Sequence, residues 1–417
     1  MDRQKDVVII GAGIVGVCTA YYLLERGRQV TILDQSDTCS GSSYGNAGAI
    51  SPSHAIPLAA PGAVESALKW MFSPESPFYL KPRFDPELLS WFWRFWRACD
   101  ASRVREVLPF LRDIERESLR LYASLVEKEK LDCDFRQEGA LYLFDTAAGF
   151  AHGVKDARLL QENGIELEVL ERQAVRDFEP LARPYASGGI RIMESAHLDP
   201  ARFVRGLAEA VKVRGGEILS HTEAIEMRKE GRGIRAIRTT RGVLHPAQVV
   251  LAAGAHSSRI ARGLGVRLPI EAAKGYSVSV RKGGACLRVP TLLKEARVYV
   301  TPFEDRIRYA GTFELDGLNM TIDRRRLDAL AKAVNRYLTG FEGLEEIEVW
   351  RGLRPMTPDA IPILGKSAAA DNLYYATGHG MVGVGLGAVS GKIVADLVAG
   401  LQPGFDLRFL APERFGV

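Results

Sequence analysis

The chain opens with a pattern of apolar and polar positions that predicts a strand, a helix and a second strand. Val7–Ile10 form a short apolar run rich in β-branched residues, which is typical of a buried parallel strand. Val17–Arg26 have the pattern of a helix that ends at Gly27, and Gln29–Leu33 give a second apolar strand. This order predicts a βαβ unit at the start of an α/β domain.

Three glycines lie between the first strand and the helix with the spacing G-x-G-x-x-G. Gly11 permits a tight turn, Gly13 lets a pyrophosphate approach the backbone, and Gly16 allows the helix to pack closely on the strand. The helix N-terminus offers free N–H groups to phosphates. Asp34, at the end of the second strand, is placed to accept hydrogen bonds from ribose hydroxyls, which favours FAD or NAD over NADP. We therefore interpret the apolar run 7–24 as this motif and not as a signal peptide or membrane span.

Strand and helix patterns recur in the middle and at the end of the chain. A helix is predicted over 200–214, followed by one strand at EILSHTEAIEM (217–227) and a buried strand at VVLAAGAHSS (249–258). Leu373–Thr377 predict a further strand, and AVSGKIVADLVAG (388–400) a helix. Pieces of a nucleotide-binding domain thus occur at three separate places in the chain.

The predicted domain is interrupted by a second one. We expect residues 1–60, about 196–264 and about 348–417 to form an FAD-binding domain, and 61–195 with 265–347 to form a substrate domain. The second set combines helices, at Ala101–Glu129 and Arg324–Leu338, with the separate strand runs ALYLF, YSVSV and RVYVTPF, which predict a mainly antiparallel sheet. The expected fold class is α/β (α+β mixed), with a Rossmann-like domain and a sheet-plus-helix substrate domain.

The glycine-rich segment after the last predicted strand favours FAD over NAD. Its glycines are Gly378, Gly380, Gly383, Gly385 and Gly387, and such a backbone can lie against a flat ring. The helix that follows would direct its N-terminus at a bound group, and a helix N-terminus stabilises the negative charge of a reduced flavin. Glycines alone leave open the alternative of a flexible loop.

Composition and charge exclude several classes of protein. The 417 residues suffice for two or three domains of ordinary globular composition, and the net charge is only +4. No run of Lys and Arg suggests a nucleic-acid partner. The five scattered cysteines include no CxxC or zinc-like spacing, so we expect no metal and a reducing, cytoplasmic compartment.

Several motifs, in this order, resemble the glycine oxidase/D-amino acid oxidase family of FAD enzymes. They are SSYGNAGAISP (42–52), HLDP (197–200), LAAGAHS (251–257), GLRPMTPD (352–359) and TGHGMVGVGLG (377–387). AAPGAVESALKWMF (59–72), KGYS (274–277) and YAGTFEL (309–315) are most similar to the branch of bacterial D-amino acid dehydrogenase small subunits. The chain departs from that branch at His54, where an aromatic residue is more usual, and at Ala224, which replaces a Val.

The motifs and the resemblance together assign a set of FAD-binding residues. In chain order the set is Gly11, Gly13, Ile14, Val15, Gly16, Asp34, Gln35, Ser42, Ser43, Asn46, Ala47, Gly48, Ala224, Ala253, Gly254, Gly378, His379, Gly380, Met381, Val382 and Gly383. In the loop SGSSYGNAGAI the small residues allow amide contacts with a pyrophosphate, and Ser42 and Ser43 add hydroxyl donors. By its chemistry alone the loop could also be an ordinary surface loop.

The resemblance implies oxidation of a D-amino or cyclic imino acid. Hydride transfer from Cα to flavin N5 would give an imine and then a 2-oxo acid, and an acceptor such as a quinone would take the electrons. A fork-shaped arginine suits the substrate carboxylate, and the resemblance gives this role to Arg354. Strand alternation would place Arg351 on the opposite side, where it supports a turn or faces solvent.

Three further residues are candidates for the catalytic site. Tyr276 would donate a hydrogen bond to the carboxylate or cap the pocket, although a core tyrosine fits the sequence nearly as well. His54 and His379 are the titratable candidates, and a structural role is the commoner one for a single histidine in a glycine-rich turn. No strong general base stands out.

The segment PELLSWFWRFWRACD (86–100) predicts a helix with a broad aromatic face. That face consists of Leu88, Leu89, Trp91, Phe92, Trp93, Phe95 and Trp96. Arg94 and Arg97 fall on the other side, as in helices that lie in a membrane interface, which would suit electron transfer to a quinone at the inner face of a membrane. The alternative is a helix packed on the core or on a partner subunit.

Other functions fit the same sequence features. A D-proline or D-hydroxyproline dehydrogenase, a glycine or sarcosine oxidase that uses O2, and a flavin-binding subunit of a larger electron-transfer complex all remain open. An NAD-dependent dehydrogenase would leave the C-terminal glycine segment without a role. The amino acid, the mode of FAD attachment and the oligomeric state are not determined by the sequence.

Overall fold

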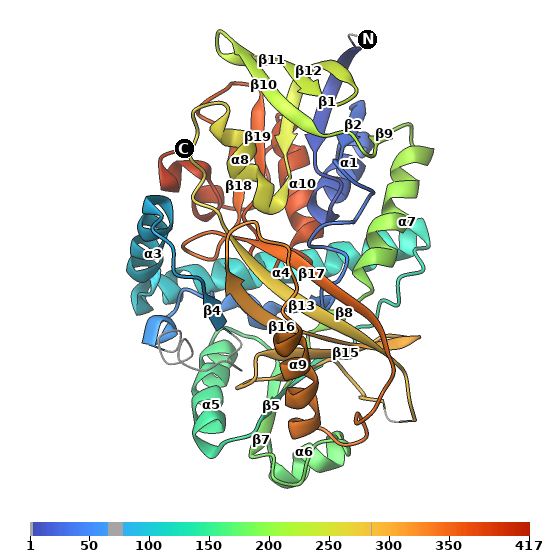
Figure 1. Ribbon diagram of the computed structural model, residues 1–417, viewed down its shortest axis with the longest axis vertical. Coiled ribbons are helices and arrows are strands. Elements are labelled where there is room, and N and C mark those ends of the chain that lie inside the picture. The colour runs from blue at the N-terminus through green and yellow to red at the C-terminus, as the bar shows by residue number, and fades with distance from the viewer. Residues whose placement is uncertain (1–2, 66–77, 285) are drawn as a thin grey trace.

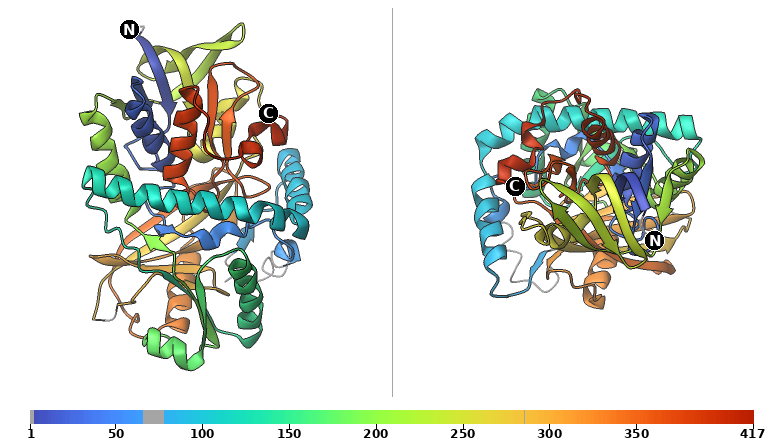
Figure 2. Two further views of the ribbon diagram at one scale, coloured as in Figure 1. Left: turned by 180° about the vertical axis from the view of Figure 1, so that it is seen from behind. Right: turned by 90° about the horizontal axis from the view of Figure 1, so that it is seen from above.

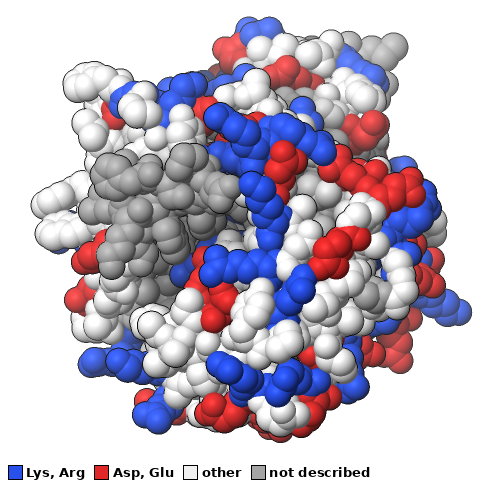
Figure 3. All heavy atoms as spheres, turned by 60° about the horizontal axis from the view of Figure 1, so that its bottom comes forward, with Lys and Arg blue, Asp and Glu red and all other residues white. Residues whose placement is uncertain are grey.

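Two large β-sheets lie one above the other along the long axis of the molecule (Figure 1). The structure, a computed structural model, describes residues 3–65, 78–284 and 286–417, so the motif AAPGAVESALKWMF (59–72) falls partly outside the described residues. Helix α4 (Ala101–Glu129) crosses the molecule between its upper and lower halves, as the rear view in Figure 2 shows. Lys and Arg side chains occur together with Asp and Glu across the face drawn in Figure 3, in keeping with the small net charge.

The first sheet gathers strands from the beginning, middle and end of the chain, as predicted. Its eight strands are β1 (Arg3–Ile10), β2 (Val30–Leu33), β9 (Glu217–Leu219), β10 (Ala224–Glu230), β11 (Gly233–Thr239), β12 (Gly242–Leu251), β18 (Ile363–Lys366) and β19 (Leu373–Thr377). Strand β1 lies between β2 and β12, parallel to both, and β19 is parallel to β12 on its other side. The parallel core is therefore completed only when distant segments meet.

The prediction of one strand over EILSHTEAIEM was wrong. The segment forms β9, which pairs with β2, and β10, which pairs with β11 in an antiparallel hairpin. His221 between them has a left-handed backbone with a φ of 51°. The N–H of Thr222 donates to the carbonyl of Asp34 (2.7 Å). Because these groups bind the loop after β2, no continuous ladder can pass through them.

The second sheet is mainly antiparallel and forms the lower half of Figure 1, also as predicted. Its strands are β4 (Phe78–Leu80), β5 (Ala140–Phe144), β6 (Leu167–Glu171), β7 (Gly188–Ile192), β13 (Glu271–Arg281), β14 (Thr291–Leu293), β15 (Val298–Pro302), β16 (Arg306–Leu315) and β17 (Glu346–Met356). Strand β17 pairs with β13 as far as Glu271↔Met356, beyond the domain boundary expected at residue 348. The exact domain bounds stay a prediction.

The helices cover the faces of both sheets. They are α1 (Ile14–Glu25), α3 (Pro86–Ala98), α4, α5 (Ala147–Glu162), α6 (Arg172–Phe178), α7 (Pro200–Val213), α8 (Ser257–Arg262), α9 (Arg324–Tyr337) and α10 (Gly387–Val398). A short strand pair, β3 (Ala49–Ile50) with β8 (Ala196–His197), completes the fold. Helix α9 covers the outer face of the second sheet, where Leu327, Leu330 and Val334 are buried with side chains of β13 and β16.

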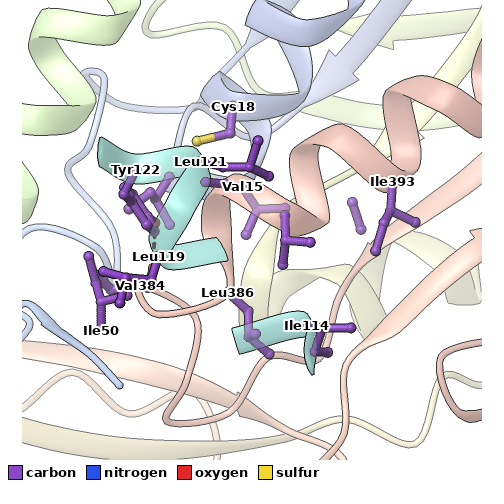
Figure 4. Packing of buried hydrophobic residues seen from close by; sticks show 14 of the residues in the cluster. Val15, Cys18, Ile50, Ile114, Leu119, Leu121, Tyr122, Val384, Leu386 and Ile393 are labelled. Carbon is purple, nitrogen blue, oxygen red and sulfur yellow. Dashed lines mark hydrogen bonds between the residues drawn. The ribbon is translucent and has the colours of Figure 1, made fainter. Parts of the chain in front are cut away.

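Helices α1, α4 and α10 share one apolar core (Figure 4). Figure 4 shows Tyr122 of α4 near Val384, in the chain that leads into α10, whereas Cys18 of α1 packs against Gly391 of α10 itself. Helix α4 also makes polar contacts with that chain: the Ser118 hydroxyl donates to the Gly385 carbonyl (2.6 Å), and the Tyr122 hydroxyl donates to the Val384 carbonyl. The core therefore holds the glycine-rich segment in place from behind.

The aromatic helix α3 packs on the core with only one side. Trp91 is buried and its indole N–H donates to the Met356 carbonyl (3.0 Å). On the outer side Leu89, Trp93 and Trp96 are 58%, 59% and 56% exposed. Core packing was one of the two expected roles, and it accounts for Trp91 but not for the outer side. None of the helices in the described parts of the chain is long and apolar enough to cross a membrane.

Candidate active site

A cavity of about 1310 Å³ extends between the two sheets. Its wall includes the turn after β1, the loop around Ser42 and Ser43, the turn at Ala253 and Gly254, and the inner face of the second sheet. A pocket for one small ligand usually has about 300–1,000 Å³. The larger volume suits a dinucleotide together with a small substrate.

The end of the cavity in the first sheet has the features of a dinucleotide site. Gly11 has a φ of 117°, and a Cβ there would lie 2.4 Å from the Ala252 carbonyl oxygen, so only glycine fits. The Ala12 N–H donates to Asp34 Oδ2 (2.8 Å). Burial raises the pKa of Asp34, while the N–H groups of Ala12 and Ser36 oppose that shift. The carboxylate is thus fixed at the predicted ribose position.

The predicted cofactor loop is bound to both sheets. On the first sheet's side, the N–H of Ile14, the first residue of α1, donates to Ser43 Oγ (3.1 Å). On the other side, the Ser42 hydroxyl donates to the Leu353 carbonyl of β17. Arg308, buried on β16, donates to the carbonyls of Tyr44 (3.2 Å) and Asn46 (3.0 Å). The loop is therefore held in a defined conformation and is not an ordinary surface loop.

Three of the predicted cofactor residues do not line the cavity. They are Gly16, Gly48 and Gly378. An added Cβ would lie 1.9 Å from the Gly11 carbonyl oxygen in the case of Gly16, 2.0 Å from the Leu198 carbonyl oxygen in the case of Gly48, and 2.7 Å from Thr357 Cγ2 in the case of Gly378. These glycines permit close packing behind the wall. The remaining predicted cofactor residues, including Gln35, Ala224, Met381, Val382 and Gly383, line the cavity.

Arg354 enters the cavity from β17. Gly275 and Gly352 face each other across β13 and β17. The Arg354 guanidinium occupies the space where a Cβ of Gly275 would be, because that Cβ would lie 2.1 Å from Nη1. Nη1 donates to the Thr312 carbonyl (2.9 Å), and burial lowers the pKa of the side chain to about 10, so it stays cationic near pH 7. Nη2 donates to the Gly311 carbonyl (3.4 Å), which leaves the Nε–H and the second N–H of each terminal nitrogen available to an anion.

Tyr276 and Arg351 are direct neighbours across the same two strands, one position along from the glycine pair. The Tyr276 hydroxyl donates to Glu314 Oε2 (3.1 Å), and Lys274 forms an ion pair with the same carboxylate (3.0 Å). Arg351 Nε donates to the Met320 carbonyl (2.9 Å). Both residues contribute to the cavity wall. The Tyr276 hydroxyl already binds a carboxylate and Arg351 makes its bond in an exposed position, whereas the Arg354 guanidinium is enclosed by protein and binds only backbone carbonyls, so Arg354 is the better candidate for an anion ligand.

The two candidate histidines line the cavity in their neutral form. Burial lowers the pKa of His379 to about 3, and its Nε2 is 2.9 Å from Ser390 Oγ. Burial, together with the charge of Lys294, lowers the pKa of His54 to about 4. Neither is a strong base near pH 7, which supports the expectation that the site has no strong general base.

Sequence reasoning missed a second group of polar residues in the same cavity. Glu115 comes from α4, Tyr142 from β5, Lys294 and Arg297 from the turn after β14, and Tyr299 from β15. No motif marks them, because they meet only through the pairing of strands that are far apart in the chain. The alternation of polar and apolar residues in VYVTP was the only available signal.

Comparison with known proteins places these features in a family. A family model described as "FAD dependent oxidoreductase" (DAO) matches residues 6–397. The chain is 33% identical to a D-amino acid dehydrogenase of Agrobacterium fabrum over 98% of this chain and 99% of that protein. It is 34% identical to another protein of that name from Granulibacter bethesdensis, again over 98% and 99%.

Solved structures show the same fold. Glycine oxidase from Geobacillus kaustophilus superimposes with a TM-score of 0.82 at 22% identity and covers 99% of both chains. L-proline dehydrogenase from P. horikoshii gives a TM-score of 0.76 at 19% identity, over 100% of this chain and 98% of the other. The residues that line the first sheet's end of the cavity fit FAD, since a fixed carboxylate and a glycine turn at the start of a helix are the groups that such a dinucleotide requires.

Substitution of Arg308 should weaken FAD binding indirectly, because Arg308 holds the cofactor loop and is not itself expected to contact the cofactor. Arg308→Lys keeps the charge but loses the planar guanidinium, which donates to both loop carbonyls from Nη1 while Nε and Nη2 bind Ser279 and Glu348, so we expect the Kd for FAD to rise about 10-fold. Quenching of FAD fluorescence during titration of the apoprotein measures this. The exposed Arg325, changed to Lys, is the control and should leave the Kd unchanged. Equal Kd values for both variants would contradict the assigned role of Arg308.

Proposed function

Because this chain belongs to the DAO family of FAD-dependent oxidoreductases, we propose that it is a dehydrogenase of D-amino acids. The observation that carries the proposal is the position of Arg354, a buried cation that enters the cavity close to the glycine-rich segment. The Gly380 N–H of that segment donates to the carbonyl of Pro355, directly after Arg354 (2.8 Å). The carboxylate anchor and the proposed flavin-binding backbone are thus joined by one hydrogen bond.

The residues of the site contribute mainly by positioning the substrate. FAD, when bound, supplies an acceptor for the hydride of the substrate Cα and later passes two electrons to an acceptor such as a quinone. Arg354 binds the carboxylate with two parallel N–H bonds and so fixes the orientation of Cα. Since His54 and His379 are neutral and weakly basic, the substrate amine binds without its extra proton or loses it to water. Water then converts the released imine into a 2-oxo acid and ammonia.

Anaerobic reduction of the flavin tests this function. D-alanine or D-proline should bleach the flavin absorbance of the purified yellow protein, whereas the L-enantiomers should leave it unchanged. Rapid peroxide formation on admission of air would identify an oxidase, and reduction only by glycine or N-methylglycine would identify a glycine or sarcosine oxidase. A protein that binds FAD but is reduced by no amino acid would be a structural flavin subunit, and the proposal would fail.

The two arginines of WRGLRPMTPD should differ in effect. Arg354→Lys removes the planar fork in the cavity, so we expect KM for D-alanine to rise about 10- to 100-fold while FAD stays bound. Arg351→Lys is the matched control, with an expected change in KM of less than about 3-fold, because its Nε already donates to the Met320 carbonyl. Steady-state kinetics and flavin content measure both. Equal effects on KM would refute the role given to Arg354.

We also propose that the outer side of α3 contacts the inner face of a membrane. Trp93 and Trp96 lie 5.2 Å apart by their ring centroids and are exposed, and Phe84, just before the helix, is 93% exposed. Arg94 and Arg97 are exposed on the same helix. Exposed Trp and Phe next to basic residues favour the interface of an anionic membrane, from which a quinone could accept electrons.

Flotation with vesicles tests the membrane contact. Wild-type protein should rise with vesicles that contain phosphatidylglycerol, and Trp93→Ser/Trp96→Ser should lower the bound fraction about 10-fold, since two large apolar side chains are lost. The matched control is Val213→Ser/Ile225→Ser, which removes exposed apolar residues elsewhere on the surface. Wild-type protein that stays entirely in the dense fraction would exclude the contact.

A further inference from the structure

The cavity continues beyond Arg354 along the inner face of the second sheet. Tyr142, Leu292 and Tyr299 occupy one row there, because Leu292 pairs with Tyr142 on β5 and with Tyr299 on β15. Lys294 and Arg297 follow at the two ends of the turn that joins β14 to β15, directly beyond the pair Leu293↔Val298. All of these residues line the cavity except Leu293 and Val298. We call the part lined by Tyr142, Leu292, Lys294, Arg297 and Tyr299 the side pocket.

Lys294 is a charged group of the side pocket for which the described residues provide no hydrogen-bond or ion-pair partner. Its side chain keeps accessible surface although protein surrounds it, so that surface belongs to the cavity. Its Nζ lies 5.0 Å from the centre of the Tyr142 ring and forms no hydrogen bond or ion pair with any residue in the described part of the chain. A buried ammonium without an anion is unfavourable, and a ligand carboxylate would remove that cost.

The charges around Lys294 leave room for one anion. Arg297 adds a second cation and Asp156 of α5 one negative charge. The Glu295 carboxylate forms no ion pair with Lys294, because it accepts hydrogen bonds from the Thr146 N–H (3.1 Å) and the Tyr337 hydroxyl (2.8 Å). Burial raises the pKa of Glu115 well above its usual range and so favours the uncharged carboxyl, and His54, with its pKa lowered to about 4, is neutral near pH 7. Arg105 of α4 and His152 of α5 also line the cavity, and His152 Nε2 lies 4.0 Å from Asp156 Oδ2. Cations are therefore in excess over ionised carboxylates around Lys294.

The distance from Arg354 to the side pocket matches a small amino acid. Arg354 donates to the carbonyl of Thr312 on β16 (2.9 Å). Strand β16 lies beside β15. A Cβ on Gly311 of β16 would be 3.2 Å from the carbonyl oxygen of Arg297, the residue just before β15. Lys294 is one strand further, directly after the last residue of β14. Two strand spacings amount to about 10 Å, which a carboxylate at each end of a short carbon chain can bridge.

We propose that the side pocket binds the side chain of the substrate and selects D-amino acids that end in a carboxylate, of the D-glutamate and D-aspartate type. Arg354 binds the α-carboxylate, and Lys294, assisted by Arg297 and the Tyr299 hydroxyl, binds the second carboxylate. This inference rests on the proposed function for the reaction itself. Lys294 is then a specificity-determining residue for the substrate and takes no part in the oxidation.

A comparison of D-glutamate with D-glutamine tests the proposal, because the two differ in charge but hardly in shape. For wild-type protein kcat/KM should be higher for D-glutamate. Lys294→Met should lower kcat/KM for D-glutamate about 10- to 100-fold and change that for D-glutamine less than about 3-fold. Lys294→Arg should retain most of the preference. Lys282→Met, at an exposed lysine, is the control for loss of one positive charge.

The pH dependence of that preference provides a second readout. Burial and the charge of Arg297 lower the pKa of Lys294 to about 8. The cation is present below that pH and is lost above it, so the D-glutamate to D-glutamine ratio of kcat/KM should fall as the pH rises through about 8. The ratio in Lys294→Met should stay flat over the same range. A wild-type ratio that does not change would contradict the role of Lys294.

Binding of glutarate separates this inference from the proposed reaction. Glutarate has both carboxylates and no amine, so calorimetric titration of the FAD-loaded protein reports binding without oxidation. Lys294→Met should weaken glutarate binding about 10-fold or more and leave butyrate binding unchanged. If no amino acid bleaches the flavin but this difference in binding is observed, the proposed dehydrogenase reaction is wrong, whereas the carboxylate-binding role of the side pocket is supported. If D-alanine bleaches the flavin and Lys294→Met alters neither ligand, the side pocket inference is overturned.

Discussion

The fold depends on hydrogen bonds at the rim of a cavity that must stay open between two sheets. Apolar contact between the inner faces would close this space, so polar groups at its edges hold the halves together. Arg308 binds the carbonyls of Tyr44 and Asn46, the Ser42 hydroxyl binds Leu353, and the Gly380 N–H binds Pro355. Each of these bonds also fixes a segment that lines the cavity. Stability and the shape of the site therefore depend on the same groups.

The electrostatics of the cavity follow from burial. Deprotonation relieves the cost of burying a histidine, and His54 and His379 are accordingly neutral. Arginine cannot follow this route near neutral pH, so Arg354 keeps its charge and must be compensated by carbonyls or by a bound anion. The cavity thus combines neutral histidines with buried cations, among them Arg354 and Lys294, and such a site is suited to binding anionic groups and less suited to proton transfer by a histidine.

The first βαβ unit, the glycine-rich segment and Arg354 could be predicted from the sequence because short local motifs specify them. The side pocket could not, because Lys294 and Tyr299 meet Tyr142 only through strand pairing between distant segments. The motif around Tyr276 left open a hydrogen bond to the substrate, a cap on the pocket and a core position. The pairing of β13 with β17 places Tyr276 next to Arg351, and its hydroxyl binds Glu314. The packing role of Gly16 followed from its place in the motif, and the close approach to the Gly11 carbonyl agrees with it. Gly48 and Gly378 were assigned to the cofactor because the glycine-rich pattern around them cannot distinguish a glycine that contacts a ligand from one that permits packing.

Helix α4 carries Glu115, Ser118 and Tyr122 along one side, spaced at about one turn each. Glu115 reaches the cavity, whereas Ser118 and Tyr122 hold the carbonyls of Gly385 and Val384. Attempts to engineer a new substrate range by replacing residues on this side of α4 would therefore also disturb the support of the proposed flavin-binding backbone. Strands β14 and β15 make no hydrogen bond to the glycine-rich segment among the described residues, although the Thr301 hydroxyl of β15 donates to the Ala47 carbonyl of the cofactor loop (2.8 Å). Positions of these two strands other than Thr301 are therefore the safer scaffold for redesign, and natural divergence in substrate choice within such a fold would meet the same restriction.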